Sequence, residues 1–122
     1  IVENFKKDDN WLVTGCGHVI DNTDDWINSH YPIYNDKIHE GNNTLGSPSI
    51  LTFRNDDPLL FDENLSWLVD CDYYKRLYDR YGEPKIINNI NVIIGIGKHQ
   101  TTYILSEELK ANEHQYMLGK YK

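Results

Sequence analysis

Residues 65–82 read LSWLVDCDYYKRLYDRYG, and the spacing of apolar side chains changes part-way along this stretch. As far as Val69 they alternate with a period of two, which predicts a short strand. Beyond Cys71 they follow helical spacing, and Gly82 is typical of a helix stop. The sequence therefore predicts a strand that runs into a helix, with Asp70 at or near the helix N-cap.

The flanking sequence predicts the rest of an α/β domain. Residues 21–48 are rich in Asn, Asp, Ser, Gly and Pro, which indicates a long loop, and such loops often carry function. Ser106, followed by two glutamates, predicts the start of a last helix. The remaining apolar runs predict strands at residues 11–14 (extended to 20 past a glycine bulge), 49–54, 85–88 and 91–96. The expected fold class is a mixed β-sheet with flanking helices.

Composition excludes several classes of protein. The chain has 122 residues, with 12 Lys and Arg against 19 Asp and Glu, so its formal charge is −7. We expect one domain, residues 1–122, and no nucleic-acid partner, because an acidic surface repels phosphate backbones. The most apolar run, residues 92–96, is too short to cross a bilayer, so we expect no transmembrane segment. Two isolated cysteines, Cys16 and Cys71, could form one disulfide, but they favour free thiols in a reducing compartment. We expect a cytoplasmic location, either free or at the inner face of the membrane.

Two acids at the predicted strand-to-helix junction are the best candidates for chemistry. Asp70 and Asp72 lie two residues apart, where a carboxylate of suitable pKa and geometry can take a proton from a hydroxyl group. The alternative, which residue chemistry alone favours, is that Asp70 caps the helix and Asp72 decorates its first turn. Trp67, directly before them, could stack on a sugar ring or belong to the core. His99 is a candidate ligand or substrate contact, or an ordinary surface histidine.

Three segments resemble the C-terminal half of a family 2 glycosyltransferase of the GT-A fold. They are Gly46-Ser47-Pro48-Ser49-Ile50-Leu51-Thr52-Phe53-Arg54, the block from Leu60 to Tyr73, and residues 86–102. The resemblance spans roughly residues 11–105. It implies a nucleotide-sugar donor, a carbohydrate acceptor and a role in polysaccharide or glycoconjugate synthesis. Family 2 enzymes transfer the sugar to an acceptor hydroxyl, usually with a divalent metal, Mn²⁺ or Mg²⁺.

The resemblance also implies roles for individual acids. In inverting members the second acid of a glutamate-aspartate pair is the catalytic base, and that position is Asp70 here. The preceding position is Val69, which departs from the family pattern and removes the neighbouring acid. Asp72 matches a further acid of the block, and we expect it to orient the helix start or bind an acceptor hydroxyl.

Three further positions are assigned by the same resemblance. Ser47 and Trp67 fall where the acceptor cleft would be. His99 falls where some members place a histidine near the metal, although Gly97 stands where the family often has arginine. The resemblance therefore assigns Asp70 to catalysis, Ser47, Trp67 and Asp72 to substrate binding, and His99 to the metal.

The nucleotide-binding half of such an enzyme, with its Asp-x-Asp motif, would precede Ile1. We therefore expect this chain to be part of a longer glycosyltransferase catalytic domain and to have little activity in isolation. An isolated half-sheet would expose an edge, so a homodimer is a further expectation. The alternative function is a non-catalytic carbohydrate-binding or protein-interaction module, which the loss of polar groups at Val69 and Gly97 favours.

Overall fold

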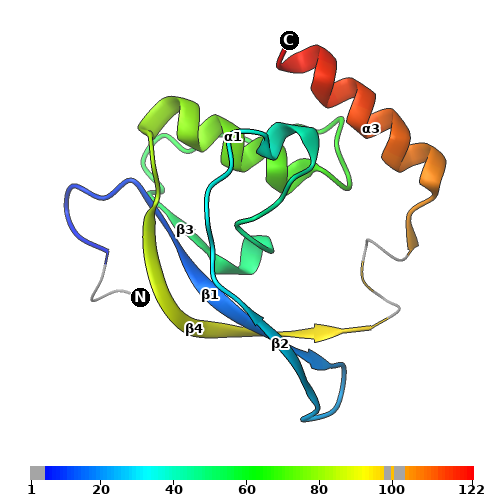
Figure 1. Ribbon diagram of the computed structural model, residues 1–122. Helices are drawn as coiled ribbons and strands as arrows, with labels where there is room; N and C mark the ends of the chain where they lie inside the picture. The colour runs from blue at the N-terminus through cyan, green and yellow to red at the C-terminus, as the bar shows by residue number, and fades with distance from the viewer. Residues whose placement is uncertain (1–4, 98–99, 101–103) are drawn as a thin grey trace.

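The computed structural model describes residues 5–97, 100 and 104–122, and its centre is a mixed four-stranded sheet (Figure 1). Strand β1 (Trp11–Ile20) pairs with the three other strands. It is parallel to β4 (Lys85–Ile96) from Leu12 to Ile20. It is antiparallel to β3 (Leu51–Phe53) at its start and to β2 (Trp26–His30) near its end. The predicted mixed sheet is confirmed.

The pairing of β1 with β4 is irregular beside Gly15, where Asn88, Asn89 and Asn91 of β4 lie opposite no residue of β1. The pairing with β4 shifts register on both sides of Gly15. Trp11 and Val13 are buried in the core before the shift, and Cys16 joins the same core after it. The extension of β1 to residue 20 is confirmed, and the irregularity falls at Gly15 as expected, although the extra residues belong to β4. The prediction of two strands at 85–88 and 91–96 was wrong, because the register shifts let β4 continue through its asparagines as one strand.

The loop predicted for residues 21–48 contains strand β2, so that prediction was wrong in part. Four of the five β2 residues are exposed and His30 is half-buried, so the strand has no alternation of apolar and polar residues to reveal it. The same segment holds a short 3₁₀ helix, η1 (Ile38–Glu40). A second, η2 (Pro48–Ile50), takes the start of the strand predicted at 49–54 and leaves the shorter β3.

Helix α1 (Val69–Tyr81) packs on the sheet and confirms the helix predicted from residue 70 onward. Tyr73, Tyr74 and Leu77 lie on its buried face. The ring of Tyr74 stacks on Trp11 of β1 with 6.3 Å between centroids. Figure 1 shows α1 on one side of the strands, so its tyrosines and leucine close the core.

The short strand predicted for residues 65–69 does not form. The carboxylate of Glu113 instead accepts the backbone N–H groups of Ser66, Trp67 and Leu68 at 2.8–3.1 Å. These donors precede α1, whose N-cap residue is Leu68 rather than Asp70. A distant carboxylate therefore satisfies the backbone groups that a strand ladder would have used.

Glu113 belongs to helix α3 (Glu107–Lys120), which lies beside the N-terminal end of α1 (Figure 1). Ser106 is its N-cap and accepts the backbone N–H of Leu109 at 3.1 Å, as the sequence predicted. Cys16 and Cys71 are both buried and unpaired. In the described part of the chain, no helix is both long enough and apolar enough to cross a bilayer.

Candidate functional site

Asp70 lies in the first turn of α1 and faces a cavity of about 290 Å³. Its side chain is half-buried. One carboxylate oxygen accepts the backbone N–H of Cys71 at 2.8 Å, and the other accepts Nδ2 of Asn43 at 3.2 Å. The cavity is lined by Gly41, Asn43, Trp67, Leu68, Asp70 and Cys71.

Burial raises the pKa of Asp70 above its ordinary value, and the hydrogen bond from the Cys71 N–H only partly offsets this effect. Among the residues that the structure describes, no lysine, arginine or histidine forms an ion pair with this carboxylate. A carboxylate that is held in place, open to a cavity and raised in pKa has the properties of a general base.

Asn43 fixes the Asp70 side of the cavity, although the sequence did not single it out for this role. Its Nδ2 group donates to the carbonyl of Gly46 at 3.0 Å as well as to Asp70. Its Oδ1 accepts the backbone N–H of Gly46, also at 3.0 Å. Gly46 has a φ of 128°, which favours glycine at this turn. The only signal in the sequence was an asparagine three residues before a glycine, a common turn pattern.

Trp67 lines the same cavity as Asp70, so the structure brings these two predicted residues together. The His114 ring of α3 meets the Trp67 ring at 5.2 Å in an edge-on geometry. Lys110 Nζ lies 5.5 Å from the Trp67 ring centroid. Gly41, also on the cavity wall, has a φ of 96°, and a Cβ there would lie 2.7 Å from His114 Cε1. Helix α3 therefore supports the tryptophan, and His114 is a second contributor that the sequence reasoning missed.

Asp72 lies in different surroundings, with no exposed surface. Its carboxylate pairs with Arg76 Nε at 3.0 Å and with Lys120 Nζ at 2.7 Å. It also accepts a hydrogen bond from the Tyr121 hydroxyl. These contacts favour a role in orienting the helix start over contact with a substrate.

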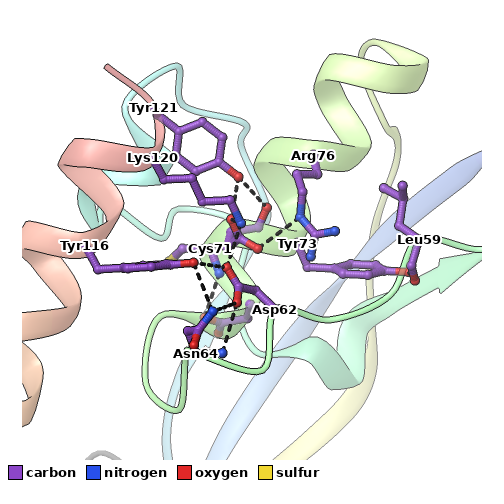
Figure 2. Close-up of polar contacts among 11 residues, drawn as sticks. Leu59, Asp62, Asn64, Cys71, Tyr73, Arg76, Tyr116, Lys120 and Tyr121 are labelled. Carbon is purple, nitrogen blue, oxygen red and sulfur yellow. Dashed lines mark hydrogen bonds and ion pairs between the residues drawn. The ribbon is translucent and has the colours of Figure 1, made fainter.

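The lysine that pairs with Asp72 also holds a second carboxylate. Lys120 Nζ lies 2.8 Å from Asp62, which accepts the Tyr116 hydroxyl at 2.6 Å (Figure 2). The hydrogen bonds from Lys120 and Tyr116 hold the pKa of Asp62 well below its usual range. We call Asp62, Asp72, Lys120 and Tyr121 the ionic cluster. It ties the end of α3 to α1.

The structure does not bring Ser47 to Asp70. Ser47 is the N-cap of η2, where its hydroxyl oxygen accepts the backbone N–H of Ser49 at 3.3 Å, and it does not line the Asp70 cavity. His99 lies outside the described residues. Within the described ranges, His, Cys, Asp and Glu side chains form no cluster of three or more that could hold a metal ion. The described residues therefore offer no set of ligands for the divalent metal expected for the whole enzyme.

No family model, curated protein or solved structure matches this chain. Its function must therefore be argued from the geometry around Asp70.

Proposed function

We propose that this chain is the acceptor-binding half of an inverting glycosyltransferase, of the family 2 type that the sequence resembles, and that Asp70 is its catalytic base. The observation that carries the proposal is the setting of Asp70. It faces a cavity beside Trp67, burial raises its pKa, and no cation of the described chain neutralises it.

The chemistry assigned to these residues is limited to the acceptor side. An acceptor hydroxyl in the cavity donates its proton to an Asp70 oxygen as the hydroxyl oxygen bonds to the anomeric carbon of the donor sugar. The bond from that carbon to the nucleotide phosphate breaks, and the electron pair leaves with the phosphate. The configuration at the carbon inverts, and Asp70 later releases its proton to water. Trp67 offers an aromatic surface to the C–H face of the acceptor sugar.

Asn43 positions Asp70 and takes no part in the reaction itself. Its three hydrogen bonds connect Asp70 to the turn at Gly46. A carboxylate held at both oxygens keeps its geometry while the substrate binds, which is how a positioned base gains efficiency. The proposal assigns no step to a metal.

Substitution of Asp70 by asparagine tests the proposal in the protein at its native length. Nucleotide release would be measured with UDP-glucose, UDP-galactose, UDP-N-acetylglucosamine and GDP-mannose, each with a mixture of oligosaccharide acceptors. We expect Asp70→Asn to lower turnover about 100-fold or more, because the substitution removes the base. The side-chain oxygen of the asparagine still accepts the Cys71 N–H.

Asp79→Asn is the matched control, since Asp79 is an exposed carboxylate on the same helix, paired with Lys75. It should leave turnover unchanged. Equal turnover in Asp70→Asn and the wild type would contradict the proposal. Binding of oligosaccharides without turnover of any of the four donors would favour the non-catalytic carbohydrate-binding module, which the same cavity could serve.

A further inference from the structure

A second cavity, of about 350 Å³, lies against strands β1 and β2. The pairing of these strands sets Cys16 opposite His30 and His18 opposite Asn28. Alternate residues of a strand share a face, so these four side chains form one block on one face of the strand pair. The cavity is lined by Cys16, His18, Asn28, Ser29, His30, Asn43 and Gly46.

The two cavities share a wall. Asn43 lines both of them, and its Nδ2 group donates to Asp70 on one side and to the Gly46 carbonyl on the other. The block of His18, Asn28 and His30 therefore lies across Asn43 from Asp70. The volumes of the two cavities are near the lower end of the ~300–1,000 Å³ range of ligand sites. Each cavity therefore suits a single sugar unit better than a larger ligand.

The side chains of the second cavity suit hydroxyl groups. His30 Nε2 donates to the carbonyl of Thr44 at 2.7 Å, which fixes that ring. Nδ1 of His18 lies 2.7 Å from Oδ1 of Asn28, which leaves its other ring nitrogen and the Asn28 N–H groups for a ligand. The side chains that line the cavity include no Lys, Arg, Asp or Glu. A phosphate would call for cationic partners, whereas sugar hydroxyls both donate and accept.

We propose that the second cavity binds the sugar unit next to the reacting one, so that the acceptor is an oligosaccharide of at least two units rather than a monosaccharide or a lipid phosphate. Asp70 faces the reacting unit, and His18 and Asn28 hydrogen-bond its neighbour. This inference rests on the proposed function and deepens it by naming the acceptor class.

A glycan array carrying oligosaccharides of one to six units tests the inference with the native-length protein. We expect retention on structures of two units or more and none on the monosaccharides. His18→Ala and Asn28→Ala should each weaken retention about five- to tenfold, the range expected for one lost hydrogen bond to a ligand. Asn42→Ala is the matched control, because Asn42 is exposed and lines neither cavity. It should bind as the wild type does.

The two proposals fail separately. Retention that is equal for one and two units, or unchanged in both His18→Ala and Asn28→Ala, overturns the inference and leaves the role of Asp70 standing. Absence of retention on every glycan also overturns it. The role of Asp70 is read from turnover, and Asp70→Asn should keep the oligosaccharides bound on the array while turnover is lost.

Discussion

The two aspartates in the first turn of α1 occupy opposite environments. Asp70 is half-buried, faces a cavity and has neutral hydrogen-bond donors only. Asp72 is fully buried and is compensated by Arg76, Lys120 and Tyr121. Loss of a compensated buried carboxylate leaves its partner charges buried and unpaired, so such a group anchors the elements that it joins. An uncompensated carboxylate beside a cavity costs stability and is available for chemistry. The difference separates a candidate base from a structural anchor in the same helical turn.

Helix geometry explains why the two differ. Residues two positions apart point about 200° away from each other around an α-helix. Asp70 therefore turns toward Asn43 in the loop before η2, and Asp72 turns toward the end of α3. Their partners come from segments on either side of α1 in sequence. Substitutions that affect only one of the two aspartates, or only its partners, therefore test the difference between them.

The largest effect is expected for Asp72→Ala. It would leave Lys120 and Arg76 without their buried partner, so we expect the free energy of unfolding to fall by about 3 kcal/mol or more. Urea denaturation would measure the loss. Asp79→Ala removes a more exposed ion pair of the same helix and should cost less than about 1 kcal/mol. Equal losses in the two variants would mean that the ionic cluster does not anchor α1.

A smaller loss is expected for Asn43→Ala. The substitution removes the acceptor of the Gly46 N–H, one of the two donors to the Gly46 carbonyl (the Tyr74 hydroxyl remains) and the donor to Asp70. We expect a loss of about 2 kcal/mol in the free energy of unfolding, and a further rise in the pKa of Asp70, because one stabilising contact to its charged form is gone. Asn42→Ala, one residue earlier and exposed, should change neither quantity. An unchanged pKa of Asp70 would show that Asn43 does not hold the carboxylate.

The smallest effect is expected for Asp70→Asn, and it depends on pH. Because the pKa of Asp70 is raised in the folded state, its ionised form is less favourable there than in the unfolded chain. The stability of the wild type is therefore highest at low pH and falls as the pH rises through the folded pKa of Asp70. Asparagine does not ionise, so the variant should gain stability relative to the wild type as the pH rises. Its NH2 group replaces one of the two oxygens that accept from the Cys71 N–H and Asn43 Nδ2, so at low pH the variant should be the less stable protein.

The pH dependence of the stability difference between the variant and the wild type is the control for this prediction. The relative gain should vanish below the ordinary aspartate pKa of about 3.9, where the carboxyl is protonated in both the folded and the unfolded wild type. Thermal unfolding of both proteins between about pH 3 and about pH 7 would measure the difference. A stability difference that stays constant over this range would contradict the raised pKa of Asp70.

Local patterns in the sequence predicted much of this fold. Helical spacing and Gly82 located α1, and Ser106 located α3, because caps and apolar periodicity act over a few residues. Strand β2 escaped prediction because its residues are nearly all exposed. The strand predicted at 65–69 failed because Glu113, more than forty residues away in sequence, takes its backbone donors.

The candidate site was predicted in part for the same reason. Asp70 and Trp67 stand close in sequence, and the structure places both on one cavity. Asn43 and His114 reach that cavity region from distant segments, so no local spacing could reveal them. The separation of Asp72 from Asp70 depends on Lys120 and Tyr121, almost fifty residues further along the chain. Residue chemistry alone proposed two acids but could not assign them different roles, which only the resemblance did.

The most direct test of this account is a carboxyl ¹³C NMR titration of the native-length protein, with Asp62 as the internal reference. The account predicts that Asp70 titrates above the ordinary aspartate pKa of about 3.9, while Asp62 titrates below it. An Asp70 midpoint at or below that ordinary value would contradict the claim that this carboxylate is set apart as a base.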